Sequence, residues 1–303
     1  MWFYNKIEFK YLISKLIIIL YYTMYTSKYL KNKAIKLFDV TLRDGLQSIP
    51  KIYSLNDKMN ILTNIINQRN PYAIEIGSIV SPKILPQMAN SIELLENFII
   101  NTNYPIYKLP KLYMLTPTVK SVDIALHNNI RNISLITSVS DSFQKKNTNK
   151  TLKDNKKEIF NIMKLSHQVQ HVNTKLYVSC ISECPIIGHI NVNTIINEII
   201  YYYYVYDTLD EICLSDTCGT LQFKTFKTII DELITRTIDL NKISLHLHDQ
   251  PNNPSNLRNI IIYAMKKGIY RFDVSIMPNI GGCSVTMDST HGNLSYDQIH
   301  ECM

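Results

Sequence analysis

The sequence predicts an α/β protein of the (β/α)8 class, a TIM barrel with a short last helix. Short β-rich runs alternate with longer segments whose apolar residues recur at about the helical spacing of 3.6 residues. Eight such pairs fill about 265 residues, a typical length for this barrel. Polar side chains also gather where the runs end, and in a barrel those ends form one mouth. An open, doubly wound sheet fits less well, because no glycine-rich dinucleotide loop follows the first run.

The predicted strands follow one another at regular intervals. In chain order they are Lys36–Leu42, Tyr72–Ser78, Lys111–Thr116, Asn132–Ser138, Lys175–Cys180, Glu211–Asp216, Ile243–Asp249 and Arg271–Met277. Two examples of the helical spacing between them are Ile61, Leu62, Ile65, Ile66 and Phe226, Ile229, Ile230, Leu233. The last helix is expected to be short because the sequence stops at Met303, where that helix should only be starting.

The composition indicates a globular protein and argues against nucleic-acid binding. The hydrophobic fraction is 46% and the charged fraction 19%, which excludes a disordered chain. The net charge is +7, but residues 1–36 contain seven lysines and one acid, so only +1 remains for residues 37–303. A nearly neutral body offers no phosphate-binding stripe. None of the six cysteines forms a CxxC pair, which disfavours a zinc knuckle and favours a reducing compartment, the cytoplasm.

Residues 1–35 read as a Lys- and Ile-rich extension in front of a catalytic domain at 36–303. Their uninterrupted apolar run is roughly 11 residues, short of the about 20 that a spanning helix needs. Three interpretations stay open: a signal or anchor segment, a targeting peptide, or residues upstream of a true start at Met24. Membrane contact, if any, is expected only through this segment, and a mitochondrial or membrane-tethered location stays open with it.

Two histidines and an aspartate predict a metal site at the mouth. His246 and His248 are two residues apart on a strand, so both imidazoles point to one face. Asp44, which follows the first strand, can add a carboxylate. Imidazole and oxygen ligands together suit Mg²⁺ or Mn²⁺ better than structural zinc. Taken alone, the histidine pair is also compatible with two ordinary polar strand residues.

Three further residues suggest how such a site would act. Arg43 could stabilise negative charge that develops on a substrate, such as that of an enolate. Glu75 lies between apolar residues and needs a partner, for which Arg43 is the natural candidate. Cys283 follows Gly281 and Gly282, and its thiol could exchange a proton with an intermediate. The structural alternatives are a surface ion pair, an orienting acid and a buried thiol.

The ordered set of motifs resembles the hydroxymethylglutaryl-CoA lyases, metal-dependent barrel lyases with an Arg-Asp-Gly signature. The resemblance covers about Lys36 to Ile299. Its motifs are Thr41–Gln47 (TLRDGLQ), Ile74-Glu75, Ser81–Lys83 (SPK), Pro86–Met88 (PQM), Tyr177–Cys180 (YVSC), His246–Asp249 (HLHD) and Gly281–Cys283 (GGC).

The resemblance implies a fold, a reaction and a role for each matching residue. It implies the barrel and cleavage of 3-hydroxy-3-methylglutaryl-CoA, or a related 3-hydroxyacyl-CoA, to acetyl-CoA and acetoacetate. The acyl-CoA is the implied partner, and a homodimer stays open. The implied metal ligands for Mg²⁺ or Mn²⁺ are Asp44, His246, His248 and Asn293. The implied catalytic residues are Arg43, Glu75, Cys283 and His246, and the implied substrate-binding residues are Arg43, Gln47 and Asp216.

Several departures keep other functions open. The loop after Cys283 is bulkier than the usual Gly-Gly-Cys-Pro pattern, and Gln250 follows His248-Asp249 where the family has threonine. Asp39-Val40-Thr41 looks more like the related synthases and aldolases. The alternatives are therefore a Claisen-type acyl-CoA synthase of the isopropylmalate or homocitrate type, a 2-oxo-acid aldolase, and a non-catalytic barrel.

Overall fold

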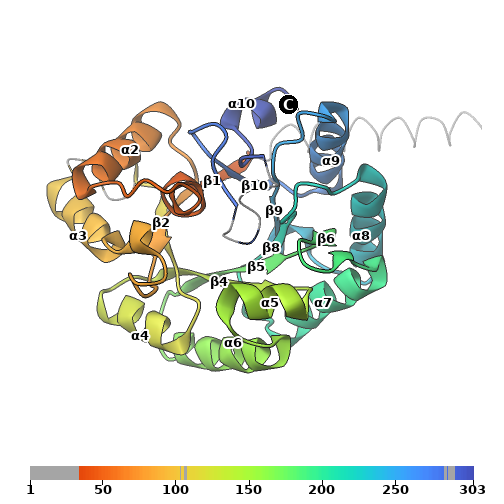
Figure 1. The fold of residues 1–303 in the computed structure, drawn as a ribbon, viewed down its shortest axis with the longest axis horizontal. Helices are drawn as coiled ribbons and strands as arrows, with labels where there is room; N and C mark the ends of the chain where they lie inside the picture. The colour runs from red at the N-terminus through yellow and green to blue at the C-terminus, as the bar shows by residue number, and fades with distance from the viewer. Residues whose placement is uncertain (1–33, 103, 106–107, 283–284, 286–290) are drawn as a thin grey trace, which may run out of the picture. The chain divides into compact units, whose positions relative to one another are not determined.

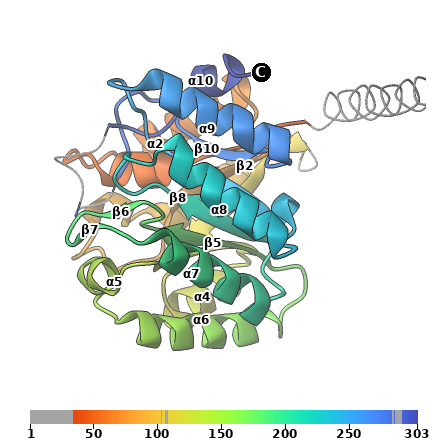
Figure 2. The ribbon, with the colours of Figure 1, turned by 90° about the vertical axis from the view of Figure 1, so that its right-hand side faces the viewer.

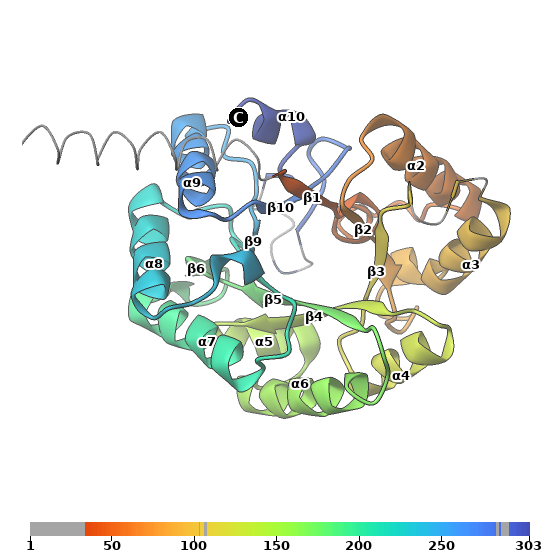
Figure 3. The same cartoon turned by 180° about the vertical axis from the view of Figure 1, so that it is seen from behind.

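The computed structural model describes residues 34–303 except 103, 106–107, 283–284 and 286–290. Eight parallel strands form a closed barrel in the order β1-β10-β9-β8-β5-β4-β3-β2. Helices surround the strands as a ring, seen along the barrel in Figure 1 and from behind in Figure 3. The predicted (β/α)8 fold is confirmed.

All eight predicted strands are present; β4 has the predicted bounds, and the other seven differ at one end or both. They are β1 Lys36–Asp39, β2 Ala73–Ser78, β3 Lys111–Leu115, β4 Asn132–Ser138, β5 Asn173–Ser179, β8 Glu211–Ser215, β9 Ile243–His246 and β10 Arg271–Val274. Strands β1, β9 and β10 each end three residues earlier than predicted. At β1, the carboxylate of Asp39 accepts the N–H of Thr41 at 2.8 Å, which replaces a ladder bond and starts a turn.

The helices lie where the apolar spacing places them. They are α2 Leu55–Gln68, α3 Ser91–Asn101, α4 Val119–His127, α5 Asp141–Thr148, α6 Leu152–Ser166, α7 Val192–Val205, α8 Phe223–Thr235, α9 Pro254–Lys267 and α10 Tyr296–His300. In α8 the predicted apolar residues Phe226, Ile229, Ile230 and Leu233 are all buried. Serine and threonine N-caps, such as Ser54 before α2 and Thr118 before α4, bind the first free backbone N–H groups. As expected, the last helix is short.

A returning segment parts two strands of the barrel at the mouth. Strands β9 and β10 share one register pair, Phe272 with Leu245, whereas β4 and β5 pair along their whole length. Beyond that pair, Leu294 donates its N–H to the carbonyl of Leu247, and Ser275 donates to the carbonyl of Leu294. The segment around Leu294 therefore enters between β9 and β10 and carries Asn293 to the mouth.

Two smaller features complete the description. A hairpin of β6 (Glu183–Cys184) and β7 (Gly188–His189) follows β5 and projects beyond the barrel in Figure 2. Among the residues with a described placement, no helix is both long enough and apolar enough to cross a membrane. The extension predicted at residues 1–35 lies almost wholly outside the described residues.

Candidate active site

A single helical turn places Arg43 and Asp44 at the mouth of the barrel. The turn Thr41–Gly45 directly follows β1, and the carbonyl of Val40 accepts the N–H groups of Arg43 and Gly45. Consecutive residues on a strand point to opposite faces. Because the strand has already ended, both neighbouring side chains line the same cavity.

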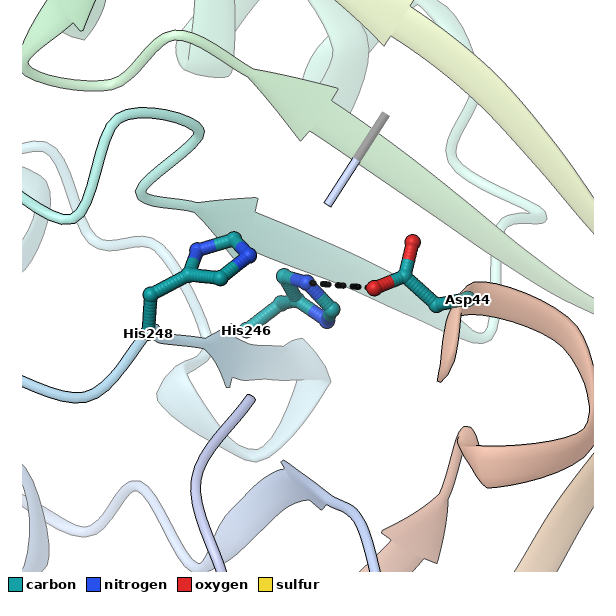
Figure 4. A group of neighbouring side chains, drawn as sticks. All are labelled: Asp44, His246 and His248. Atoms are coloured by element: carbon teal, nitrogen blue, oxygen red, sulfur yellow. Dashed lines mark ion pairs between the residues drawn. The ribbon is translucent and has the colours of Figure 1, made fainter. Parts of the chain in front are cut away.

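Asp44, His246 and His248 form a compact group of potential metal ligands (Figure 4). One ligand atom from each lies within 4.8 Å of the others, and all three residues are buried. His246 ends β9, and its Nε2 is 3.8 Å from Oδ2 of Asp44. His248 follows two residues later, with its ring centroid 5.2 Å from that of His246. The structure thus brings together the three residues that the sequence predicted as ligands.

Among the described residues, two buried atoms beside this group have no hydrogen-bond partner. The Nδ1 atom of His248 is 2.8 Å from the carbonyl of Asp216, so it carries the hydrogen and Nε2 keeps a lone pair. That Nε2 atom is buried without a partner, and so is Oδ1 of Asn293. Asn293 donates through Nδ2 to Asp44 at 2.9 Å. Unpaired buried acceptors are costly, and a cation would satisfy both.

The electrostatics of the group favour its metal-binding protonation states. Burial alone would raise the pKa of Asp44, but Arg43 and the two histidines lower it to about 2. Burial, with a contribution from His246, lowers the pKa of His248 to about 4. At neutral pH the site therefore offers an ionised carboxylate and a neutral imidazole, the forms that bind metals.

Arg43 is held by carboxylates on two sides. Its Nε donates to Glu75, as expected from the sequence, and its Nη1 donates to Oδ1 of Asp44 at 2.6 Å. Glu75 also accepts hydrogen bonds from Ser134 and from the hydroxyl of Tyr177. The guanidinium lies over the Tyr177 ring, 5.0 Å from its centroid. The orientation of Arg43 is thereby fixed without a substrate.

The remaining predicted residues occupy different positions. Gln47 lines the cavity, and its Nε2 donates to Asp44 and to the carbonyl of Gly282, both at 3.2 Å. Asp216 is buried, and its carboxylate accepts the N–H groups of Thr220 and Leu221 at 3.2 and 3.0 Å. The side-chain carboxylate of Asp216 thus fixes the loop after β8. Its backbone carbonyl accepts the hydrogen bond from Nδ1 of His248. Cys283 lies outside the described residues.

Glycine at 281 is a steric requirement of the site. Gly281 has φ +131°, and a Cβ atom there would lie 2.4 Å from the amide group of Asn293. Any larger residue would displace Asn293 from beside Asp44.

Comparisons with known proteins identify the family of the chain. The model of the family described as HMGL-like matches residues 34–295. The chain belongs to the HMGL-like family. A similar curated relative is the 3-hydroxy-3-isohexenylglutaryl-CoA/hydroxymethylglutaryl-CoA lyase of Pseudomonas aeruginosa, 27% identical over 275 residues, covering 88% of this chain and 84% of that one. The human mitochondrial hydroxymethylglutaryl-CoA lyase is 27% identical over 269 residues, covering 88% and 77%.

The solved structures give the same result. The crystal structure of hydroxymethylglutaryl-CoA lyase from Pseudomonas aeruginosa superposes with a TM-score of 0.75 at 26% identity, covering 89% of this chain and 84% of the other. The lyase from Brucella melitensis superposes with a TM-score of 0.76 at 23% identity, which supports the fold. The resemblance to this family predicted from the motifs is confirmed.

In this HMGL-like chain, sequence reasoning missed the residues behind the histidines. Asp273, on β10, places Oδ2 3.1 Å from Nδ1 of His246, and its Oδ1 binds Nζ of Lys175. An acid in the short apolar run Phe272-Asp273-Val274 is the one signal that could have drawn attention to it. Its partner Lys175 is 98 positions away, and no local pattern indicates that pairing.

The group opens into a cavity of about 860 Å³. Its lining includes the buried Arg43, Asp44, His246 and His248. The lining also includes apolar side chains and lysines: Ile79, Leu85, Ile124 and Phe143, with Lys120, Lys146 and Lys150. The cavity thus combines a buried polar group with an apolar flank and lysines, of which Lys120 and Lys146 are exposed.

Proposed function

We propose that this protein is a metal-dependent carbon–carbon lyase of the oxo-acid type, with HMG-CoA or a related 3-hydroxyacyl-CoA as substrate. Its products would be acetyl-CoA and acetoacetate. The observation that carries the proposal is the pair of unpartnered atoms, Nε2 of His248 and Oδ1 of Asn293, beside the Asp44 carboxylate. The names of the similar lyases supply the substrate class.

The donor set fits a divalent ion, with Mg²⁺ or Mn²⁺ as the proposed identity. Asp44, His246, His248 and Asn293 would hold it with two oxygen and two imidazole ligands, a mixture that disfavours structural zinc. Bound there, the ion would supply Lewis acidity to the C3 hydroxyl and a carboxylate or thioester oxygen of the substrate.

Arg43 is proposed to stabilise the negative charge that cleavage creates. A general base takes the proton of the C3 hydroxyl, C3 becomes a carbonyl, and the electrons of the C2–C3 bond pass to C2 and the thioester oxygen. In the described part of the chain Nε and Nη1 of Arg43 are bound by carboxylates, which leaves Nη2 to face that oxygen. A guanidinium that is already oriented needs no rearrangement when the charge appears.

Protonation of C2 then completes acetyl-CoA, and Cys283 is the proposed donor. Gln47 and Asp216 are proposed to contribute to substrate binding, Gln47 from the cavity wall and Asp216 through the loop that it holds. Glu75 is proposed to act through Arg43.

The shape of the cavity supports an acyl-CoA substrate. The apolar flank suits a pantetheine chain, and the exposed Lys120 and Lys146 provide cations for phosphate groups. Lys150 is paired with Glu158 at 3.1 Å and is less available.

The decisive experiment is incubation of the purified chain with HMG-CoA and Mg²⁺ or Mn²⁺, with assays for acetoacetate and acetyl-CoA. We expect both products in equal amounts, and neither after EDTA treatment. If the chain retains the metal but does not cleave HMG-CoA, the synthase alternative is tested with acetyl-CoA plus a 2-oxo acid, and the aldolase alternative with a 4-hydroxy-2-oxo acid. Neither metal retention nor turnover would identify a non-catalytic barrel.

The organisation of the chain and its location are also proposals. Residues 1–35 are proposed as an extension and 36–303 as the catalytic domain, because β1 begins at Lys36. The cytoplasm remains the proposed compartment, because a chain of 303 residues does not need disulfides to stabilise its core. A homodimer is retained for testing by light scattering.

A further inference from the structure

A row of buried charges runs behind His246. Asp273 is 1% exposed, and its two oxygens face different partners. Oδ2 lies 3.1 Å from Nδ1 of His246, and Oδ1 lies 2.5 Å from Nζ of Lys175. The carboxylate therefore links a metal-ligand candidate to a cation in the barrel interior.

Several contacts fix the side chain of Lys175 inside the barrel. Its side chain is fully buried, and its ammonium also binds Oε1 of Glu211 at 3.0 Å. Glu211 in turn binds Arg271 at 2.7 Å. The ammonium sits 3.7 Å from the centroid of the Phe38 ring, so its position is restricted on another side.

The pairing determines which nitrogen of His246 carries hydrogen. A carboxylate accepts hydrogen bonds and cannot donate them, so Nδ1 must carry hydrogen, and in the neutral imidazole Nε2 then keeps the lone pair. That Nε2 atom is the one facing Asp44. Without the cation of Lys175, a carboxylate buried at the position of Asp273 would be costly, and it would lose its charge or move.

We propose that Asp273, held ionised and in place by Lys175, is a positioning residue that sets the tautomer and orientation of His246. The inference rests on the proposed metal centre. The two histidines therefore differ in the acceptor that orients them. His248 is oriented by a neutral peptide carbonyl, whereas His246 is oriented by a charged carboxylate. A carboxylate acceptor makes an imidazole a stronger metal ligand.

The first test compares Mn²⁺ binding to the EDTA-treated full chain by calorimetry. Asp273→Asn keeps the shape of the side chain, but its amide can donate to Nδ1 and favour the wrong tautomer. We expect Mn²⁺ affinity to fall by about 10- to 100-fold. Glu211→Gln is the matched control, because it removes the other carboxylate on Lys175 without contacting His246. Its affinity should stay that of the wild type.

The second test reads the tautomer directly in the metal-free protein from the ring ¹⁵N shifts of His246. The wild type should show hydrogen on Nδ1, and Asp273→Asn should move it toward Nε2. If Asp273→Asn unfolds, the double variant Lys175→Met, Asp273→Asn removes both charges together and serves in its place. An unchanged tautomer together with unchanged Mn²⁺ affinity would overturn the inference. If the wild type does not bind Mn²⁺, the proposed metal centre is wrong. The ¹⁵N measurement of the His246 tautomer still tests the role of Asp273 in that case.

Discussion

Replacing Glu75 by glutamine should destabilise the fold markedly, although the two side chains have nearly the same shape. The Glu75 side chain is fully buried and accepts hydrogen bonds from Arg43, Ser134 and Tyr177. A glutamine offers one carbonyl oxygen, and its NH₂ group would meet donors. Among the described residues, Arg43 would keep only Asp44 as a charged partner.

The expected loss of stability follows from the burial of the Arg43–Glu75 ion pair. Removing one partner of a buried ion pair costs about 3–5 kcal/mol. Glutamine still accepts one hydrogen bond, so we expect a loss of about 3 kcal/mol in the free energy of unfolding. That is a large share of the roughly 5–15 kcal/mol that stabilises a typical domain.

Urea unfolding followed by circular dichroism measures this difference. The matched control is Glu232→Gln, which removes the same charge from an exposed pair with Arg236 on α8. That pair should contribute only a few tenths of a kcal/mol, about the usual value for an exposed helix pair. If Glu75→Gln and Glu232→Gln lower the stability equally, Glu75 does not hold Arg43 as described.

Four further outcomes are expected. His248→Ala should weaken Mn²⁺ binding by more than about 100-fold, beyond the loss typical of residues that only support a ligand; an unchanged metal stoichiometry would remove His248 from the site. Arg43→Lys should lower kcat by about 100-fold or more with little change in KM, since an ammonium does not reproduce the planar fork; a change confined to KM would make Arg43 a substrate clamp. Cys283→Ala should lower kcat by roughly 10²–10⁴-fold at unchanged metal content, and full activity in this variant would exclude a thiol as acid or base. Burial raises the pKa of Asp39 to about 6, so between about pH 4 and pH 6 the folded chain holds a proton there that the unfolded chain, with a pKa near 3.9, has released. The stability of the wild type relative to Asp39→Asn should therefore fall by up to about 3 kcal/mol between pH 4 and pH 7, measured by urea unfolding, and a pH-independent difference would contradict the assignment.

The barrel was predictable because its signals are local. Each strand is a short apolar run, and each helix repeats its apolar residues on one face, as in Phe226, Ile229, Ile230 and Leu233 of α8. The ends of the strands were less predictable. Thr41 and Leu42 have the composition of a strand, but the bond from the Thr41 N–H to the Asp39 carboxylate and the turn that follows take them out of the sheet.

The candidate site was predictable where its residues follow strands, and less so where they meet across the barrel. Asp44, His246 and His248 come together because their strands end at one mouth. Lys175 and Asp273 lie on β5 and β10, and their pairing depends on closure of the barrel. Asn293 lies in a segment that returns between two strands, and among sequence signals only the resemblance to the family indicated it.

That returning segment also closes the base of the segment 281–292. Asn293 donates its N–H to the carbonyl of Ile280 at 2.8 Å, so the two ends of the loop are joined at its base. Gly281 donates to Ser48 and Gly282 donates to Asp44, which anchors the first end to the turn after β1. Doubling the length of a loop whose ends are already held together costs only about 0.6 kcal/mol of closure entropy. A change in the number of residues between these anchors should therefore cost little stability, while Asn293 keeps its place beside Asp44.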